Sequence, residues 1–325
     1  MLHFEPKELT VPKLHQILLG GIAPRPIALV STISESGISN LTPFSFYNVF
    51  GANPPIIAFS PSRRGRDGSL KDSYNNLVTT KECVVHAVTF SMVEQISLAS
   101  TEYAPEIDEF IKSGLTPIDS DLVKPKRVKE SPFQMECILK DMMSYGSGGA
   151  SANIAICEVI KIHCAEDVFK DGIIQPQLID LISRMSADYY CRANGDSIFI
   201  VEKPNQKKGI GYDNLPDIIK LSDTYSANNL GRFANIESIP TEKDVLNFVK
   251  EIKLKSIPEF EISEEAFQRY QQTNQYEKMF KLALYYLESN HPKKELFIER
   301  TAKCALEKGD SIFAWKAALT PSYIK

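Results

Sequence analysis

Short runs of β-branched and other apolar residues, separated by turn residues, dominate the sequence from about residue 26 to residue 201. Runs of this length and composition are typical of β-strands. In the run 133–142, FQMECILKDM, apolar and polar side chains alternate with a period of two, which predicts a strand with one buried face. The apolar face carries Phe133, Met135, Cys137 and Leu139, and the opposite face carries Gln134, Glu136 and Lys140.

Further strands are predicted at 26–33, 55–60, 82–88, 153–163 and 197–202. The segment after the first of these contains Gly37, which adopts positive φ readily, so a hairpin is predicted there. Short helices are predicted at 71–81, 91–101 and 106–114, with Asp72 or Ser73 as the cap of the first and a capping box formed by Ser91 and Glu94 at the second. Because strands outnumber helices and do not alternate with them, we expect a mainly β domain, a closed or split antiparallel barrel, rather than a doubly wound sheet.

The pattern changes after about residue 220, where apolar residues recur every three or four positions. Thr241 and Asp244 have the spacing of a capping box, and one helix is predicted from Ser263 to Ser289. Another helix ends at Gly309, and a last one carries Trp315. We therefore expect two domains, 1–220 and 221–325, the second a helical extension packed on the barrel or on a partner subunit. The stretch 274–292 resembles one tetratricopeptide helix pair, but no second copy follows at the required period.

Charge and composition exclude several classes of protein. The net charge of -4 and the isoelectric point near 5.9 argue against a broadly basic surface, so nucleic acid is not an expected partner. No run of apolar residues is long enough for a membrane span, and the N-terminal residues lack a basic segment followed by an apolar one. The six cysteines include no C-x-x-C pair. Free thiols in a reducing cytoplasm are the expected state.

Common catalytic and metal-binding motifs are absent from the sequence. It contains no G-x-S-x-G, H-E-x-x-H, Walker or G-x-G-x-x-G motif in the required context. The five histidines show no ligand spacing beyond His163 next to Cys164, and neighbouring side chains in a strand point to opposite faces. We expect neither a hydrolytic triad nor a metal site.

Two stretches are candidates for binding a cofactor. The segment 60–73, SPSRRGRDGSLKDS, leads into a predicted helix N-terminus, and its hydroxyls, cations and free amides suit a phosphate, although a solvated surface turn has the same composition. Its candidate donors are Ser60, Ser62, Arg63, Arg64, Arg66, Lys71 and Ser73. The segment 31–48 combines hydroxyls and an amide with aromatic rings, as the edge and face of a flat heteroaromatic ring require; the alternative is a Ser/Thr-rich barrel strand with core aromatics. Its candidate residues are Ser31, Thr32, Thr42, Phe44, Ser45, Phe46, Tyr47 and Asn48.

Six blocks, in order along the chain, resemble the flavin reductase-like family, relatives of flavoredoxin. They are PRPIALVST (24–32), G.SNLTPFSFYN (37–48), NPPIIAFSP (53–61), KDS..N (71–76), TEYAPEIDEF...GLTP (101–117) and KGIGYDNLP (208–216). The resemblance implies a six-stranded antiparallel split barrel of Greek-key type, usually a homodimer, that binds FMN in a groove near the subunit interface. The helical extension has no counterpart in minimal members of the family.

The resemblance also implies roles for individual residues. Ser31 and Thr32 would lie near the ribityl or phosphate end of FMN. The isoalloxazine ring and ribityl chain would face Thr42, Ser45, Phe46 and Asn48. The loop and helix start that hold the phosphate would comprise Ser60, Ser62, Arg63, Lys71, Asp72 and Ser73, with the choice of arginine among 63–66 left open.

The function implied is that of an FMN-dependent oxidoreductase that passes hydride from NAD(P)H to bound flavin and then electrons to a free flavin, a ferric complex or a redox partner protein. His163 is a candidate contact of the nicotinamide or substrate, and a solvated strand end is the alternative. A different class is a non-catalytic FMN-binding electron carrier or flavin sensor. An activity like that of pyridoxine-phosphate oxidase is a third hypothesis.

Overall fold

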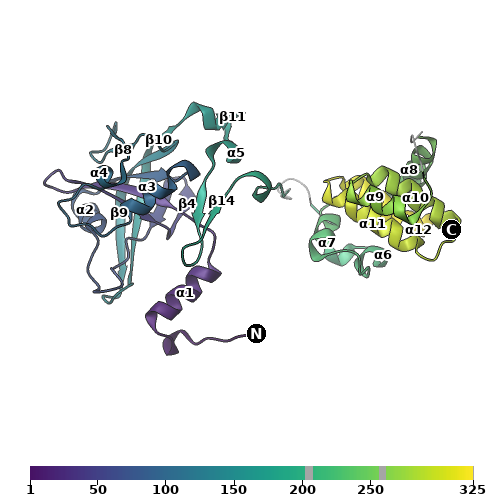
Figure 1. Ribbon diagram of the computed structural model, residues 1–325, viewed down its shortest axis with the longest axis horizontal. Coiled ribbons are helices and arrows are strands. Elements are labelled where there is room, and N and C mark those ends of the chain that lie inside the picture. The colour runs from purple at the N-terminus through teal and green to yellow at the C-terminus, as the bar shows by residue number, and fades with distance from the viewer. Residues whose placement is uncertain (202–207, 256–260, 325) are drawn as a thin grey trace. The chain divides into compact units, whose positions relative to one another are not determined.

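The chain folds as two compact units, Met1–Ile200 and Val201–Lys325 (Figure 1). The computed structural model describes residues 1–201, 208–255 and 261–324. The predicted domain boundary between 220 and 221 falls inside the second unit, because Leu215 and Ile219 are buried in its core. The block 208–216, which the resemblance assigned to the first domain, therefore belongs to the helical unit.

A seven-stranded antiparallel sheet forms the centre of the first unit, in the order β3-β2-β6-β9-β10-β5-β4. Its strands are β2 (Ala28–Ile33), β3 (Ser39–Phe44), β4 (Tyr47–Ala52), β5 (Pro55–Phe59), β6 (Glu82–Ala87), β9 (Phe133–Tyr145) and β10 (Ala152–Cys164). The edge strands β3 and β4 do not pair with each other in the described part of the chain. The strand number implied by the resemblance is thus corrected from six to seven, and among the described residues the sheet does not close into a complete barrel.

Most predicted strands are confirmed. The hairpin of β2 and β3 turns at Gly37, whose φ is +85°, and pairs Val30 with Thr42. The strand predicted at 197–202 is wrong over 197–201, because Asn194 and Ser197 cap each other around a 3-10 turn, Gly195–Ser197. Its last residue, 202, lies outside the described residues.

Strand β9 is buried on both faces over its first half, so the prediction of one buried face is wrong there. Gln134 and Glu136 are 6% and 0% exposed. The carboxylate of Glu136 accepts hydrogen bonds from the N–H groups of Asp121, Leu122 and Val123, at 2.9, 2.6 and 3.2 Å. A loop thus covers the polar face and satisfies the buried charge, which periodicity alone could not show.

Short helices and small sheets surround the large sheet of the first unit. The helices are α1 (Val11–Gly21), α2 (Asp72–Thr80), α3 (Val93–Ala99), α4 (Glu109–Ser113) and α5 (Pro176–Ile179). The small sheets pair β1 (Arg25–Pro26) with β13 (Ile182–Arg184) and β14 (Tyr190–Arg192), β7 (Pro117–Ile118) with β8 (Arg127–Val128), and β11 (Phe169–Lys170) with β12 (Ile173–Ile174).

The predicted helix caps of the first unit are wrong. Helix α2 starts after Lys71, which makes no side-chain cap, and neither Asp72 nor Ser73 caps it. A 3-10 turn, Phe90–Met92, precedes α3 and takes the place of the predicted capping box. Local side-chain spacing indicated helix starts that the tertiary structure moved by one or two residues.

Two apolar clusters hold the first unit together. One lies within the curved sheet and includes Phe44, Phe59 and Cys137. The other packs Leu29 and Leu41 of the sheet against Phe110 of α4 and Ile96 of α3. The second cluster fixes α3 and α4 beside β3, where the candidate site lies.

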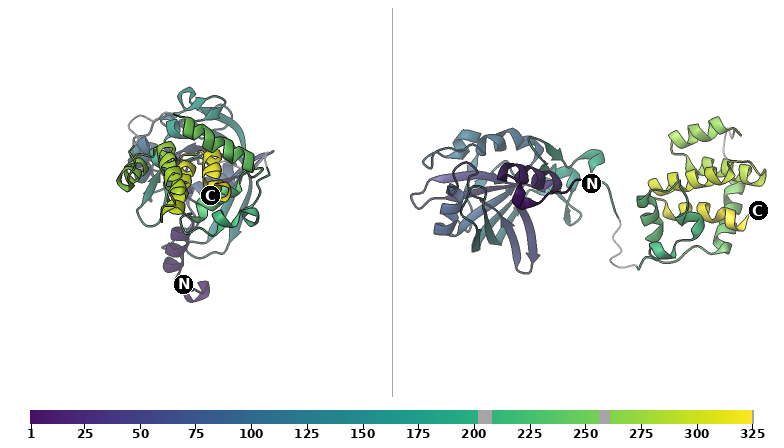
Figure 2. Two further views of the ribbon diagram at one scale, coloured as in Figure 1. Left: turned by 90° about the vertical axis from the view of Figure 1, so that its right-hand side faces the viewer. Right: turned by 90° about the horizontal axis from the view of Figure 1, so that it is seen from below.

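Helices fill the second unit, as predicted. They are α6 (Asp217–Lys220), α7 (Ala227–Ala234), α8 (Glu242–Leu254), α9 (Glu264–Gln272), α10 (Tyr276–Glu288), α11 (Lys294–Glu307) and α12 (Ser311–Tyr323), and Figure 2 shows them from two further sides. The predicted capping box of Thr241 and Asp244 is confirmed at the start of α8. The single helix predicted over 263–289 is two helices, because Asn274 has a φ of +54° between α9 and α10.

All six cysteines are free. Cys164 is exposed and Cys191 is intermediate, whereas the other four are buried. Within the described ranges, no helix combines the length and the apolar character that crossing a membrane requires.

Candidate functional site

The loop between β5 and α2 places Arg64 at the centre of an ionic cluster. Its Nη2 lies 3.0 Å from Asp72 Oδ2, and its Nε lies 3.7 Å from Glu102 Oε1. Its Nη1 also donates to the carbonyl of Leu70. The Arg64 side chain is only 16% exposed, so these contacts hold the guanidinium in one orientation.

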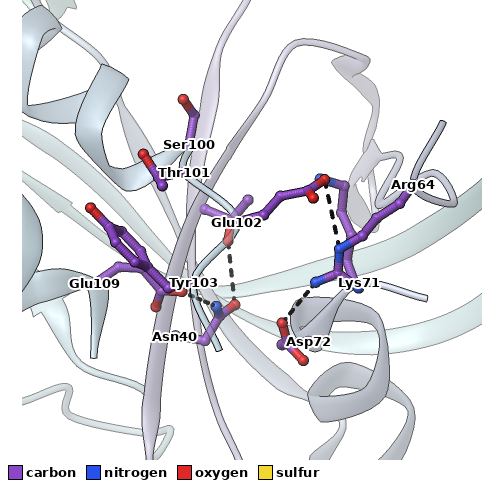
Figure 3. Close-up of a pocket in the computed structure, with 10 residues that line it drawn as sticks. Asn40, Arg64, Lys71, Asp72, Ser100, Thr101, Glu102, Tyr103 and Glu109 are labelled. Atoms are coloured by element: carbon purple, nitrogen blue, oxygen red, sulfur yellow. Dashed lines mark hydrogen bonds and ion pairs between the residues drawn. The ribbon is translucent and has the colours of Figure 1, made fainter. Parts of the chain in front are cut away.

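A hollow in the surface lies beside this cluster (Figure 3). Arg64, Lys71 and Asp72 line one side of it. The Nζ of Lys71 lies 5.9 Å from the centroid of the Phe44 ring. Burial, and then the charge of Arg64, lower the pKa of Lys71 from its ordinary value. An anion in the hollow would offset this lowering, because its negative charge would stabilise the protonated form of Lys71.

The other side of the hollow is built on a buried carboxylate. Glu109 is 5% exposed and accepts from the side-chain amide of Asn40 and the N–H of Leu41, both at 3.0 Å. Burial raises the pKa of Glu109, although the N–H of Leu41 opposes it. Thr42 and Tyr103 also line this side. Asn40 and Glu109 are 69 residues apart in sequence, and their hydrogen bond ties α4 to β3.

Two buried polar atoms next to the loop have no hydrogen-bond partner within the described residues. They are Oγ of Ser73, a residue 1% exposed in the first turn of α2, and Nε of Arg63. A buried unsatisfied donor costs about 1–3 kcal/mol, so such atoms are uncommon without a ligand or water. A helix N-terminus, an orphan hydroxyl and basic side chains together form a donor set that fits a phosphate group.

The turn that joins β9 to β10 packs on the basic loop. The N–H of Arg63 donates to the carbonyl of Ser151 at 3.0 Å. A Cβ on Gly149 would lie 2.5 Å from the carbonyl oxygen of Gly65. The glycine-rich segment 145–151 therefore supports the basic loop of its own chain.

The predicted ring-binding and phosphate-binding residues occupy different surroundings. Thr42, Lys71 and Asp72 line the hollow. Thr32 is buried behind it, where its hydroxyl donates to Asn40 at 3.3 Å and accepts from Asn76 at 3.1 Å. Ser31 is not brought to the hollow, because its buried hydroxyl donates to the carbonyl of Lys126 at 2.5 Å.

The remaining predicted residues lie outside the hollow's lining. The hydroxyls of Ser60 and Ser62 lie 2.9 Å apart and bond to each other. Arg63 donates from Nη1 to the carbonyl of Gly68 at 2.8 Å. Ser45, Phe46 and Asn48 lie at the junction of β3 with β4, where Phe46 and Asn48 are exposed.

Several residues of the hollow were missed from the sequence. Asn40 lies in block 37–48, whereas Glu102, Tyr103 and Glu109 lie in block 101–117, and only contacts across the fold bring the two blocks together. The block 101–117 carried a signal, since it occurred in the family pattern. Arg64 was left open among three arginines; it lines the hollow, whereas Arg66 is 77% exposed.

His163 lies away from the hollow's lining and contacts a buried carboxylate. Its Nε2 lies 2.7 Å from Glu136 Oε1, and together with Asp121 they form a group whose ligand-type atoms lie within 4.8 Å of one another. Burial pushes the pKa of Glu136 up, but the N–H of Asp121 and the His163 ring outweigh it and the pKa is lowered. Lys161 pairs with Asp121. Protein groups thus already compensate both carboxylates.

Comparisons with known proteins agree with this geometry. The model of the flavin reductase like domain matches residues 20–181. An uncharacterised protein of Aquifex aeolicus is 36% identical over 197 residues, which cover 60% of this chain and 97% of that protein.

Solved structures are also similar to the first unit. Nitrilotriacetate monooxygenase component B from Bacillus cereus is 31% identical, with a TM-score of 0.58 over 62% of this chain and 98% of that chain. A flavin reductase with a split barrel domain from Shewanella frigidimarina is 23% identical, with a TM-score of 0.54 over 62% of this chain and 100% of that chain; at this identity the likeness concerns the fold alone. The chain belongs to the flavin reductase-like family.

Proposed function

We propose that the first unit binds FMN and uses it to oxidise NAD(P)H, with the phosphate of FMN at the basic loop and the start of α2. The observation that carries the proposal is the buried hydroxyl of Ser73, which has no partner among the described residues and lies in the first turn of the helix that follows Lys71, in a chain of the flavin reductase-like family. When bound, FMN supplies the acceptor for a hydride and passes the electrons on to a second acceptor.

The basic side chains have distinct tasks in this proposal. Arg64 and Lys71 neutralise the phosphate, and Asp72 with Glu102 keeps the Arg64 guanidinium in place. The hydroxyl of Ser73 and the free N–H groups of the first turn of α2 donate to the phosphate oxygens. The Arg63 side chain holds the loop closed through the carbonyl of Gly68.

In this proposal the opposite wall of the hollow positions the cofactor and takes no part in the reaction. Thr42 presents its hydroxyl to the hollow at 3.5 Å from Oδ1 of Asn40. Glu109 holds Asn40 and the backbone of β3 in register with α4. Ser45, Phe46 and Asn48 remain our candidates for the ring end of the cofactor, since they follow β3 directly.

The first experiment is an FMN titration of the purified full-length protein, followed by flavin fluorescence. Arg64→Ala and Lys71→Met are each expected to raise the Kd at least about tenfold, because a hydrogen bond to a charged group contributes about 1.5–3 kcal/mol. Arg66→Ala is the matched control, because Arg66 belongs to the same loop and is exposed. Equal losses in all three variants would mean that general charge, rather than this site, attracts the flavin.

The second experiment is anaerobic mixing of the FMN-loaded protein with NADH or NADPH. Rapid bleaching of the flavin absorbance is expected with at least one nucleotide. Bleaching with dithionite but with neither nucleotide would reject the reductase and leave an electron carrier or sensor. Absence of any spectral change on adding FMN would reject the cofactor itself.

We also propose that two copies of the chain associate. Helix α1 has no buried residue and exposes Val11 and Leu18, Ile22 directly after it is exposed, and the edge strand β4 exposes Val49 and Phe50. Exposed apolar surface of this kind favours association. Light scattering coupled to size exclusion should give twice the chain mass, and Phe50→Glu with Leu18→Glu should give the mass of one chain.

A further inference from the structure

A second hollow of the first unit lies between α3 and the hairpin of β13 and β14. It has a volume of about 580 Å³, and Val93 and Ile182 give it an apolar floor. Ser100, at the end of α3, lines both this groove and the hollow at the basic loop. The two hollows therefore adjoin at Ser100, although their other lining residues differ.

Two arginines stack on aromatic rings at the groove. The Cζ of Arg184 lies 4.5 Å from the centroid of Tyr190, which stands directly opposite it across the two strands. The Cζ of Arg192 lies 3.9 Å from the centroid of Phe90. Tyr190 and Phe90 are 43% and 47% exposed. Flat cationic and aromatic faces thus stand open to solvent, and such faces bind a planar ring well.

The positive charge at this groove is only partly compensated. Arg192 forms a bidentate ion pair with Asp180, in which Nε and Nη2 each lie 2.7 Å from a carboxylate oxygen. The one carboxylate that pairs with Arg184 among the described residues is that of Asp188, whose side chain is fully exposed, at 3.7 Å. Arg25, the Cα partner of Arg184 on β1, is 5% exposed and pairs with no carboxylate in the described part of the chain.

The guanidinium of Arg25 binds only backbone carbonyls, those of Leu19, Ile22 and Met185. Of the neighbouring arginines Arg25 and Arg184, only Arg184 pairs with a carboxylate among the described residues, and that carboxylate, Asp188, is fully exposed. The excess of positive charge at the Arg184 end selects an anionic group.

The wall formed by α3 is polar and carries no cation among the residues that line the groove. It presents the carboxylate of Glu94 and the hydroxyls of Ser97 and Ser100. A carboxylate and hydroxyls in this position suit the hydroxyl groups of a sugar or an exocyclic amine. They do not suit a second anion.

We propose that this groove binds a nucleotide, with its heteroaromatic ring on the arginine and aromatic faces, its sugar toward Glu94 and its phosphate toward Arg184. Two sources share this chemistry: the adenosine diphosphate part of NAD(P)H, and a free flavin mononucleotide taken as electron acceptor. The groove adjoins the proposed FMN site, so either source would bring a redox partner next to the cofactor. The redox role of the bound nucleotide rests on the proposed function, whereas binding of a nucleotide in the groove does not depend on it.

The test is calorimetric titration of the full-length, FMN-loaded protein with ADP, with 2′,5′-ADP and with further FMN as separate probes. At least one probe should bind with one site per chain, and Arg184→Glu should weaken it at least about tenfold, equivalent to 1.4 kcal/mol. Arg269→Glu is the matched control, because Arg269 also lies over a tyrosine and pairs with a carboxylate, but in the helical unit. It should leave the Kd within about twofold.

The identity of the probe that binds separates the two sources. Binding of ADP or 2′,5′-ADP with a matching rise in KM for NADH or NADPH in Arg184→Glu identifies the dinucleotide. Binding of a second FMN alone identifies a flavin acceptor. Failure of all three probes, or equal affinity in wild type and Arg184→Glu, overturns the proposal.

The same titration keeps this proposal distinct from the proposed function. If ADP binds through Arg184 but neither NADH nor NADPH bleaches the flavin, the nucleotide-binding groove is supported and the reductase activity is rejected. If NADH bleaches the flavin but none of the three probes binds through Arg184, the reductase is supported and the groove is rejected.

Discussion

The two units of this chain treat polar groups in opposite ways. Of the sixteen buried polar or charged residues in the described part of the chain, thirteen lie in the first unit. The three in the helical unit satisfy themselves locally; the hydroxyls of Thr301 and Thr320, for example, donate to the carbonyls one turn earlier. In the first unit such groups join distant segments, as Asn40 and Glu109 do. Buried polar residues are thus concentrated in the unit that carries the candidate site, whereas the core of the helical unit is mainly apolar.

The largest expected effect tests the helical core. Phe280 is fully buried and packs on the rings of Phe248 and Phe313, with ring centroids 5.0 and 5.5 Å apart. Phe280→Ala should lower the free energy of unfolding of the helical unit by about 3–5 kcal/mol. The only tryptophan of the chain, Trp315, lies in this unit, so its fluorescence during urea unfolding follows this unit alone.

The matched control is Tyr285→Ala on the same helix, because Tyr285 is 45% exposed. FMN affinity should stay within about twofold in both variants. A large loss of FMN affinity in Phe280→Ala would break the comparison, because the helical core would then support the site.

The next effect concerns a buried histidine of the first unit. His86 is 1% exposed; its Nδ1 lies 2.8 Å from the carbonyl oxygen of Leu29, and its Nε2 accepts from the N–H of Val128 at 3.0 Å. This arrangement needs a neutral ring, and burial lowers the pKa of His86 to about 4. In the unfolded chain the ring takes up its proton near pH 6.5. Unfolding therefore takes up a proton between these two values, and the free energy of unfolding falls as the pH falls through them.

The size of this effect is about 3 kcal/mol, since one pKa unit corresponds to about 1.4 kcal/mol. This contribution of His86 to the free energy of unfolding should be fully lost by about pH 4 and fully present above about pH 6.5. Urea unfolding by circular dichroism, compared between wild type and His86→Gln at several pH values, isolates it. A constant difference between the two proteins from pH 7 to pH 4 would contradict the assignment.

A smaller effect has opposite signs in the free and the FMN-loaded protein. Ser73→Ala removes a buried hydroxyl without a partner, so the free protein should gain about 1 kcal/mol of stability. The same change should weaken FMN binding about tenfold. Thermal unfolding with and without FMN measures both. Destabilisation of the free protein would show that water or a protein group satisfies the hydroxyl.

The smallest effect concerns the cap of α8. Thr241→Ala removes both hydrogen bonds of its side chain with Asp244 and should cost about 1 kcal/mol, read from Trp315 fluorescence. The control is Thr273→Ala, at the end of α9, which should lower the free energy of unfolding by roughly 0.5 kcal/mol or less. A larger loss in the control than at the cap would contradict this ranking.

The sequence predicted the elements with local causes. Alternation located β9, Gly37 located the first hairpin, and the spacing of Thr241 and Asp244 located the start of α8. The burial of Glu136 could not be predicted, because the N–H groups that satisfy it belong to a loop more than ten residues away in the chain. The open sheet, with β3 and β4 at its two edges, depends on pairings between distant strands.

The candidate site was predictable only in part. The basic composition of 60–73 pointed to Arg64, Lys71 and Ser73, because a helix followed directly. The family pattern marked block 101–117, but the partners of Glu102 and Glu109 could not be predicted, because an acidic residue carries no local sign of the cation or amide that it will contact. Local chemistry marks where a ligand group could bind, but the fold decides which side chains complete the site.

The close approach of Gly149 to Gly65 has a consequence for protein engineering. The shape of the basic loop depends on its own hydrogen bonds and also on the tip of the hairpin that joins β9 to β10. Grafting residues 60–73 alone onto another scaffold would transfer the charges without the conformation. The smallest portable unit is the loop together with the tip that joins β9 to β10, and a single side chain at residue 149 would be enough to separate the two.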